Sequence, residues 1–478
     1  MPFRFERMAE ARVLLTNPAG EFIILTDAEF QQFTQKSLKT DSPLYLNLKS
    51  KAFLCHDLHP AMEQALASQW RTKKAFLEAG PRLHIFVPTL RCNQGCGYCQ
   101  VSRADTNARG VDMSRADAIK AIETMLCAPS QHLSMEFQGG EPLLAFDMVA
   151  WMMQEANARA RDAGKSLSFV ICTNLTLLTE RHLRILAKYK VDISTSLDGP
   201  ADLHDRNRPM TGAAAHALVV ENIRRCHELL GPGSVSALMT TTRHSLGRAQ
   251  DILDEYLVND LHSIFLRELN PYGFAQKSAK SVGYETAEFC AFYADALDRI
   301  MTLNRRGQSL REGYAALLLR KILTPFGVGF VDLQSPTGEG FGTLLYNHDG
   351  NIYASDEARM LAEMGDHSFR LGEIGTPWAE LMTCDTMLQL ASAGVAEALP
   401  GCSDCAFVPY CGADPIRHYR TQGDMVGHRP TSSFCQKQKF IFQQLFHILE
   451  TADTDSLNML LGWITPNRTR LPVPSWLK

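Results

Sequence analysis

LHIFVPTLRCNQGCGYCQVSR, residues 83–103, joins a predicted strand to a polar loop that carries three cysteines. The apolar run Leu83–Leu90 is typical of a buried strand. Cys92, Cys96 and Cys99 follow with the spacing C-x3-C-x2-C. Three thiolates around one small centre leave it an open position, whereas a structural zinc ion takes four protein ligands. The loop therefore indicates a centre that carries out chemistry, and a cluster of iron and sulfur held by three cysteines fits this description.

The composition limits the class of protein. The chain has 478 residues, enough for about two to four domains and a large core. Apolar residues make up 45% and charged residues 21%, and the net charge is −4, so we expect neither a nucleic-acid nor a membrane partner. The start, MPFRFERMAE, has no apolar signal segment, and no apolar run approaches ~18 residues. Thirteen cysteines in such a chain favour metal sites over disulfides, and we expect a cytoplasmic protein.

Predicted strands and helices alternate from Leu83 to about Leu269. The segments LSMEFQGGEPLL, LSFVICTN, DISTSLDG, VSALMTTT and SIFLREL follow the first strand, and helical stretches separate them. Ser114, with Asp117 three residues later, and Thr179 are placed as N-caps of two of these helices. This alternation predicts an α/β fold with a parallel sheet and right-handed crossovers. In barrel-like folds the chemistry lies at the carboxyl ends of the strands.

Polar motifs stand where three of these strands end. Residues 138–142 (QGGEP) close the second strand, and their two glycines would let the backbone approach a ligand. Thr173 and Asn174 close the third strand, and residues 196–200 (SLDGP) close the fourth. Turn capping is the alternative role for Thr173, Asn174 and Asp198. An H-D-x-x-R element follows, in which a surface ion pair is the alternative for the two charged residues, Asp205 and Arg208.

Tyr98, just before the last cysteine, completes a pattern that resembles the radical S-adenosylmethionine (SAM) enzymes. The resemblance implies a partial (β/α)6 barrel over residues 81–323 and a [4Fe–4S] cluster whose open iron binds SAM. In that family the reduced cluster cleaves SAM, and a 5′-deoxyadenosyl radical takes a hydrogen atom from the substrate. Carried onto the matching motifs, the resemblance implies SAM contacts from Tyr98, Gln138, Gly139, Gly140, Glu141, Thr173, Asn174, Ser196, Asp198 and Arg208.

Residues 324–478 carry a second group of cysteines with the spacings x2, x5 and x23: Cys402, Cys405, Cys411 and Cys435. Four thiolates make a closed site, which by their number fits a zinc ion or an iron–sulfur cluster equally well. The spacing resembles the SPASM extension of radical SAM peptide maturases. That resemblance implies auxiliary [4Fe–4S] clusters, two of them where the full set of seven cysteines is present.

Two departures from the SPASM pattern bear on the number of clusters. Ser355 stands where a G-x4-C element has its cysteine, and Pro415 stands where a further cysteine would follow Cys411. We therefore expect one auxiliary cluster, and two clusters in all. Cys384 is a candidate spare ligand. Packing in the protein interior is the default for the remaining cysteines, which are Cys55, Cys127, Cys172, Cys226 and Cys290.

Two further elements of the C-terminal segment follow from pattern alone. Asp349-Gly350 is a hairpin turn between short apolar runs. Ile441, Phe442, Leu445, Phe446 and Leu449 recur at helical spacing, so we expect one face of a helix in the core.

Residues 1–80 are expected to form a separate module. Residues 17–20 (NPAG) make a turn between apolar runs, which predicts a hairpin, and Thr26 begins a helix. Residues 44–54 could form another pair of strands, and residues 59–80 an amphipathic helix that ends at Gly80. The module resembles the winged-helix unit with which peptide-modifying enzymes hold a leader peptide on a strand edge. The alternative is a domain that only packs on the enzyme body.

FVPTLRCNQGCGYCQVSR, YASDEARM and YCGADP together resemble the radical SAM maturase of the His-Xaa-Ser system. The resemblance implies a ribosomally made peptide or small protein as substrate and oxidative cross-linking of its side chains. It also implies an external electron donor of the flavodoxin or ferredoxin type, and a possible partner radical SAM maturase. The auxiliary cluster would accept an electron or serve only the structure. Asp356, Glu357 and Asp414 are candidate bases by position, with solvation or capping as the alternative.

Three other functions remain open at this point. One is a different radical SAM peptide chemistry, such as thioether formation, epimerisation or sulfatase-type oxidation. Another is a radical SAM enzyme that acts on a small molecule. The last, from another class, is a zinc-stabilised peptide-binding scaffold without redox chemistry, which predicts a colourless protein.

Overall fold

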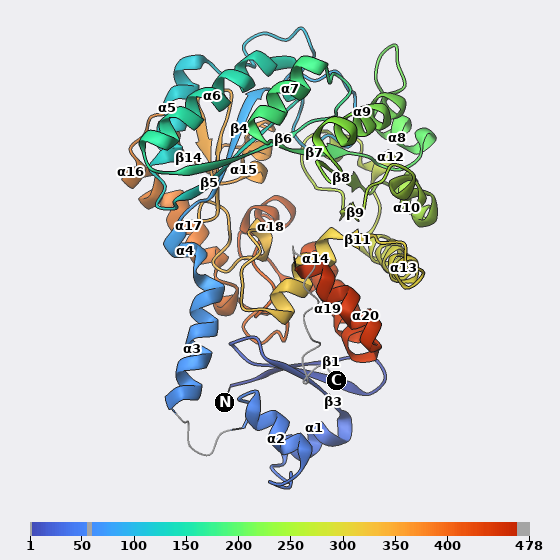
Figure 1. The fold of residues 1–478 in the computed structure, drawn as a ribbon. Helices are drawn as coiled ribbons and strands as arrows, with labels where there is room; N and C mark the ends of the chain where they lie inside the picture. Colours follow the sequence, from blue (N-terminus) through green and yellow to red (C-terminus); the bar gives the residue numbers. More distant parts are fainter. Residues whose placement is uncertain (1, 55–59, 466–478) are drawn as a thin grey trace.

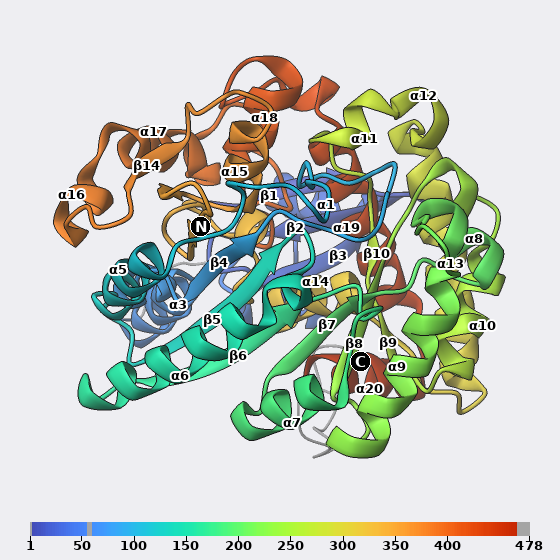
Figure 2. The ribbon, with the colours of Figure 1, turned by 90° about the horizontal axis from the view of Figure 1, so that it is seen from above.

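One nine-stranded sheet runs through the body of the molecule (Figures 1 and 2). The computed structural model describes residues 2–54 and 60–465. The strand order is β10-β8-β7-β6-β5-β4-β12-β13-β14. The first six strands in this order are parallel, as the alternating pattern predicts. Neighbours in space are successive in the chain, except that the short strand β9 lies between β8 and β10. They are β4 (Leu83–Thr89), β5 (His132–Gly139), β6 (Ser166–Cys172), β7 (Asp192–Ser196), β8 (Val235–Thr240) and β10 (Leu266–Arg267).

Helices between these strands cover the outer side of the sheet (Figure 2). Asp117 N–H donates to the Ser114 hydroxyl at 3.0 Å and His182 N–H to the Thr179 hydroxyl at 3.3 Å, so both predicted N-caps are confirmed. The helices between the strands are α5 (Arg115–Leu126), α6 (Phe146–Asp162), α7 (Glu180–Tyr189), α8 (Ala201–Asn207), α9 (Ala215–Leu230) and α10 (Ala249–Val258). After β10 come α11 (Phe274–Lys277), α12 (Ala279–Val282), α13 (Thr286–Arg305) and α14 (Gly313–Leu323). Short strands β9 (Ser263–Ile264) and β11 (Arg311–Glu312) pair with each other.

The C-terminal segment continues the same sheet. β12 (Thr343–Tyr346) pairs parallel with β4, and β13 (Asn351–Tyr353) returns antiparallel to β12 through the predicted turn at Asp349-Gly350. Gly350 has φ +84°, a conformation that favours glycine. The segment after residue 323 is therefore joined to the barrel strands by backbone hydrogen bonds. The remaining elements are β14 (Arg370–Glu373), α15 (Asp356–Ala362), α16 (Trp378–Thr383), α17 (Asp385–Gly394), α18 (Pro415–Gln422), α19 (Ser433–Thr451) and α20 (Thr454–Ile464).

The N-terminal module is a three-stranded antiparallel sheet with helices on one face. β1 (Arg4–Arg7), β2 (Arg12–Thr16) and β3 (Phe22–Thr26) lie in that order, and the predicted hairpin joins β2 to β3. Thr26 caps α1 (Asp27–Thr34) as expected, with Glu29 completing a capping box.

The prediction of strands over residues 44–54 is wrong. Ser42 caps α2 (Pro43–Ser50), and Pro43 at its first position carries the fixed φ that suits a helix start. This start signal outweighs the alternation of apolar residues that follows it. The expected helix over residues 59–80 is α3 (Pro60–Lys74) followed by α4 (Phe76–Ala79), and it ends at Gly80. His59 and Cys55 lie outside the described residues.

The module packs on the C-terminal segment, below α19 and α20 in Figure 1. The Phe22 ring meets that of Phe446 on α19 at 5.1 Å between centroids. The Thr16 hydroxyl donates to the Ala406 carbonyl at 2.7 Å, and the Tyr410 hydroxyl donates to the Gly20 carbonyl at 3.0 Å. The five apolar positions predicted for the C-terminal helix are all buried on α19, which confirms them as core. No helix within residues 2–54 and 60–465 is long and apolar enough to cross a membrane.

Candidate active site

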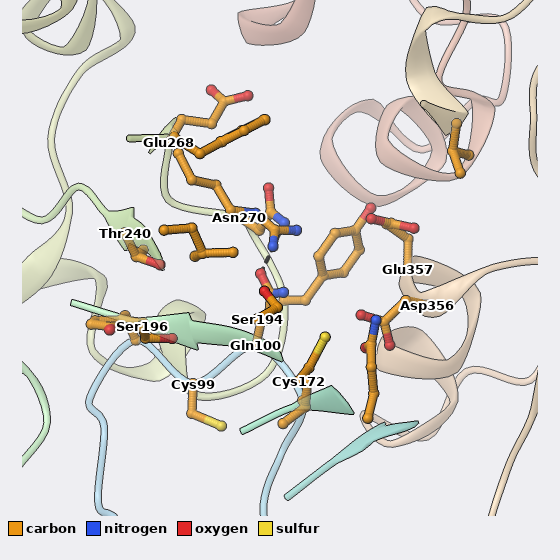
Figure 3. Close-up of a pocket in the computed structure, with 18 of the residues that line it drawn as sticks. Cys99, Gln100, Cys172, Ser194, Ser196, Thr240, Glu268, Asn270, Asp356 and Glu357 are labelled. Atoms are coloured by element: carbon orange, nitrogen blue, oxygen red, sulfur yellow. Dashed lines mark hydrogen bonds between the residues drawn. The ribbon is translucent and has the colours of Figure 1, made fainter. Parts of the chain in front are cut away.

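A cavity of about 610 Å³ lies where the parallel strands end, between the barrel strands and the C-terminal segment (Figure 3). Cys92, Cys96 and Cys99 all line it. It is also lined by eight of the ten residues predicted to contact SAM: Tyr98, Gln138, Gly139, Gly140, Thr173, Asn174, Ser196 and Arg208. Residues spread over more than a hundred positions in the chain therefore meet at one place.

The cysteine loop is fixed by backbone hydrogen bonds to three other segments. Cys92 N–H donates to the Ala104 carbonyl at 3.0 Å, and Gly95 N–H donates to the Pro209 carbonyl at 2.7 Å. Phe274 N–H donates to the Cys99 carbonyl at 2.8 Å. Burial raises the pKa of Cys92 to about 11 and that of Cys96 to about 12. Bound iron would supply the positive charge that stabilises the thiolates here, so the three thiols beside an open cavity fit a cluster with one free position.

The two glycines at the end of β5 are required by the cysteine loop itself. A Cβ on Gly139 would overlap the carbonyl oxygen of Thr89, and a Cβ on Gly140 would overlap those of Leu90 and Arg91. Gly140 N–H donates to the Thr89 carbonyl at 2.9 Å. Gly139 also has φ +134°. The close approach expected for a ligand is thus already made by the backbone that leads into Cys92.

Glu141 is predicted as a SAM contact, but it is fully buried and does not itself line the cavity. Its carboxylate accepts hydrogen bonds from Thr173 Oγ1 at 2.6 Å, Asn174 N–H at 2.8 Å and Leu143 N–H at 2.9 Å. Burial raises the pKa of Glu141, and these three bonds oppose that rise. Glu141 therefore ties the exit of β5 to the exit of β6.

Asp198 is likewise buried behind the wall and positions two lining residues. Its Oδ2 accepts from the Tyr98 hydroxyl at 2.6 Å and from Arg208 Nε at 3.1 Å. The Arg208 guanidinium lies 5.2 Å from the centre of the Tyr98 ring. The alternative of a surface ion pair between Asp205 and Arg208 is wrong, because Arg208 is buried against Asp198, while Asp205 accepts from His216 N–H at 2.8 Å.

Asn93 and Thr176, for which the sequence gives no predicted role, complete this framework. Asn93, inside the cysteine loop, donates to Thr176 Oγ1 at 2.8 Å and accepts from Asn174 Nδ2 at 2.9 Å. Together they fasten the loop to the exit of β6. The side-chain amide of Asn93 could have been recognised from the sequence, because a loop of this kind needs side chains that hydrogen-bond to other segments.

Cys172 lines the cavity, which corrects the expectation that it only packs. It is the last residue of β6, and its Sγ lies 3.3 Å from Glu136 Oε1. Side chains alternate along a strand, so Phe169 and Ile171 face the helices, and Cys172 faces the cavity. Of the other single cysteines that the structure describes, Cys226 and Cys290 are buried as expected, and Cys127 is exposed at the end of α5.

The three candidate bases also line the cavity. Figure 3 shows two of them, Asp356 and Glu357, on the side away from Ser196 and Thr240. Asp356 forms an ion pair with the buried Arg359. Burial, followed by the charge of Asp356, raises the pKa of Glu357. The pKa of Asp414 is raised to about 7, because burial and the nearby Asp332 and Glu357 outweigh the opposing effect of Arg417. Asp414 also caps α18.

The second cysteine group surrounds a separate cavity of about 30 Å³, lined by Cys402, Cys405, Cys411 and Cys435. Arg429 Nε donates to Cys402 Sγ at 2.9 Å. Burial raises the pKa of the Cys405, Cys411 and Cys435 thiols, as at the first site. Within the described ranges, no three His, Cys, Asp or Glu side chains are placed as ligands of one single metal ion.

Ser355 and Pro415 serve as helix starts where the full pattern has cysteines. Ser355 caps α15, and Pro415 is the first residue of α18. Cys384 lies at the start of α17 and lines neither of the two cysteine cavities. The four sulfurs thus make a closed site that fits one auxiliary cluster.

Comparison with known proteins gives a consistent result. The sequence model of the radical SAM superfamily matches residues 86–255. The cysteine-type anaerobic sulfatase-maturating enzyme of Clostridium perfringens (strain 13 / Type A) is 31% identical over 124 residues, which cover 24% of this chain and 32% of that enzyme. The structure of native anSMEcpe with bound AdoMet aligns with 77% of this chain and 98% of the anSMEcpe chain, at 18% identity and a TM-score of 0.63. The structure of Streptococcus suis SuiB bound to the precursor peptide SuiA aligns with 91% of this chain and 98% of the SuiB chain, at 14% identity and a TM-score of 0.54. These two structures share the fold.

Proposed function

We propose that this enzyme, whose residues 86–255 form a radical SAM domain, modifies side chains of a ribosomally made peptide or small protein. Its cofactors are a [4Fe–4S] cluster and SAM, which when bound supply the radical that takes a hydrogen atom from the substrate. The observation that carries the proposal is the 610 Å³ cavity, where the cysteine motif meets carboxylates from a separate segment. Such a volume is ample for one cofactor and an entering side chain. SuiB, which shares the fold, binds its precursor peptide SuiA.

Oxidative cross-linking of two side chains is the reaction that we favour within this class. Residues of the chain have three tasks in it: the cysteine loop holds the cluster, the strand ends orient SAM, and a carboxylate accepts a proton. Sulfatase-type oxidation is the second candidate, because the sequence match includes sulfatase-maturating enzymes. We place the four-cysteine site as a holder of one auxiliary cluster, with an electron donor of the flavodoxin or ferredoxin type outside the chain.

Mass spectrometry of a peptide tests the proposal. The reconstituted enzyme is incubated with SAM, a reductant and a short peptide encoded beside its gene. Cross-linking predicts loss of two hydrogen atoms and no fragmentation between the two joined residues. A product with unchanged mass would point to epimerisation. Loss of two hydrogens from a single serine, or from a single cysteine whose sulfur is also replaced by oxygen, would point to sulfatase-type oxidation. Formation of 5′-deoxyadenosine without any change in the peptide would contradict the peptide substrate.

Asp414 is the carboxylate whose pKa suits a proton acceptor near neutral pH. Because only its ionised form accepts a proton, we expect the turnover rate to fall as the pH drops through about 7. Asp414→Asn should lower the rate of peptide modification by about 10²- to 10⁴-fold and remove this pH dependence. The initial rates of product formation between pH 5.5 and 8.5 measure both effects. A full rate with an unchanged pH profile in the variant would exclude Asp414 as the base.

The N-terminal module offers strand edges for a peptide, because β1 and β3 each have one unpaired side. Phe3 and Phe5, beside the β1 edge, are 37% and 46% exposed and lie over the α1 rings of Phe33 and Phe30. Changing both to serine should weaken peptide binding about ten-fold, because less apolar area is buried. Isothermal titration measures the affinity.

The matched control for that prediction is Leu46→Ser on α2, which is 56% exposed. It should leave the affinity unchanged, and both variants should still cleave SAM. Equal affinity of the Phe3/Phe5 variant and the unmodified protein would mean that the β1 edge is not the binding edge. Deleting the whole module is a poorer test, because it would uncover Phe446 and the face of α19 around it.

A further inference from the structure

We propose that the side of the cavity opposite the SAM motifs binds a cationic side chain of the substrate peptide, that of lysine, arginine or protonated histidine. The proposal rests on the proposed function and names the substrate chemistry of the same cavity. Four carboxylates that line the cavity and affect one another's pKa make up what we call the acidic wall: Asp332, Glu339, Glu357 and Asp414.

The acidic wall is assembled from four places in the chain. Asp332 lies in the short 3-10 helix Val331–Leu333 that follows α14, and Glu339 precedes β12. Glu357 stands in the first turn of α15, and Asp414 caps α18. Asp414 and Glu357 both raise the pKa of Glu339, and Asp332 and Glu357 raise that of Asp414. These carboxylates are therefore close enough to repel one another, which is costly in a buried site unless a cation joins them.

Cations of the protein do not balance this group. Arg417 donates to Glu268 Oε1 at 2.6 Å, and Lys437 pairs with the same carboxylate. Although burial raises the pKa of Glu268, these two cations lower it to about 2. Arg267 lowers the pKa of both Glu136 and Glu357. Arg103 and Arg208 pair with Asp105 and Asp198. The rest of the cavity lining holds three cations, Arg267, Arg417 and Lys437, against seven carboxylates: Glu136, Glu268, Asp356 and the four of the acidic wall.

Tyr272 gives an independent sign that a ligand belongs here. Its side chain lines the cavity, its residue is only 1% exposed, and its hydroxyl has no hydrogen-bond partner among the described residues. Asp414, Glu357 and Glu339 all influence its pKa, so the hydroxyl lies among the wall carboxylates. A buried hydroxyl without a partner costs free energy. A cationic group hydrogen-bonded to the carboxylates could also donate to the Tyr272 oxygen.

The occupant is part of the peptide and not SAM, because the motifs that match SAM sites come from the ends of the barrel strands. Figure 3 shows Glu357 across the cavity from Ser196 and Thr240. A side chain that enters from the peptide would be flanked by the acidic wall on one side and by the bound SAM on the other. The wall would therefore place a chosen residue beside the reacting atoms and reject acidic ones.

Binding of capped amino acids to the reconstituted, SAM-saturated enzyme tests this inference without any turnover. The probes are Nα-acetyl-arginine methylamide against its citrulline analogue, and Nα-acetyl-lysine methylamide against its norleucine analogue. We expect each cationic probe to bind about ten-fold more tightly than its neutral partner, measured by ligand-observed NMR titration. Because no SAM is cleaved, the result is independent of whether the enzyme modifies peptides.

The variant Glu339→Gln/Glu357→Gln should abolish this preference, and Tyr272→Phe should reduce it. Burial raises the pKa of both glutamates, so their neutral isosteres should not weaken the fold, and a thermal melt checks this. Glu380→Gln on the exposed face of α16 is the control that should keep the preference. Equal binding of charged and neutral probes would overturn the inference. A preference that survives in the double variant, or a double variant that alters only SAM affinity, would overturn it as well.

Discussion

Cys96→Ala is expected to abolish SAM cleavage. Cys96 is the middle thiol of the cysteine loop and lines the same cavity as Cys92 and Cys99. With one of three thiolates removed, the cluster loses a ligand. Cys172 also lines the cavity, but its Sγ lies 3.3 Å from Glu136 Oε1. We expect 5′-deoxyadenosine formation to fall by about 10³-fold or more, towards the uncatalysed rate. Chromatography of anaerobic reactions with dithionite measures the product, and the iron content should fall by about four atoms per chain.

The control for this prediction is Cys127→Ala. Cys127 is exposed at the end of α5 and lines neither cysteine cavity. Its iron content and its deoxyadenosine formation should match those of the unmodified protein. Full SAM cleavage by Cys96→Ala would show that the cluster is held elsewhere, and the assignment of the cysteine loop would then fail.

Gly140→Ala is expected to cost the enzyme its cluster through the backbone alone. The added Cβ would overlap the carbonyl oxygens of Leu90 and Arg91, which directly precede Cys92. These atoms cannot yield without moving the cysteine loop, because Gly140 N–H and Glu141 N–H hold the same stretch of backbone at 2.9 and 2.7 Å. We expect a loss of about 1–3 kcal/mol in the free energy of unfolding and a reduced iron content after reconstitution.

The matched control is Gly327→Ala, where a Cβ meets no atom within 4 Å and the φ angle is not positive. It should leave stability and iron content unchanged. Denaturant unfolding followed by circular dichroism measures the first quantity, and iron analysis the second. If Gly140→Ala also retained both, the glycines would be needed only for a ligand, and the structural role assigned to them would be wrong.

Local signals in the sequence were sufficient for the barrel and for the first site. The apolar run before Cys92, the caps Ser114 and Thr179, and the motifs after the strands are short-range patterns. Each pattern specifies a local structure, namely a strand, a helix start or a turn, and a parallel sheet then brings the strand ends together. Fold class, cysteine loop and most of the cavity lining were therefore predictable.

Features that depend on contacts between distant segments were not predictable in the same way. Glu141 belongs to the matching motif, yet its carboxylate accepts hydrogen bonds from Thr173, Asn174 and Leu143 behind the cavity wall. The sequence predicts only packing for Cys172, because an apolar strand does not reveal which face borders a cavity. It predicts strands where α2 lies, because the alternation of apolar residues hides the weight of the Ser-Pro helix start. The acidic wall joins four loops and helix starts, and no pattern within any one of them shows the others.

The presence of two clusters is tested by iron and sulfide analysis of anaerobically reconstituted protein, with electron paramagnetic resonance of the reduced sample with and without SAM. We expect about eight irons per chain, from one open cluster at the cysteine loop and one closed cluster at Cys402–Cys435. We also expect that SAM shifts one signal and leaves the other unchanged. A content of about four irons per chain would mean that the protein has no auxiliary cluster. A content of about twelve would mean that it has a second auxiliary cluster. Zinc without iron would contradict the account altogether.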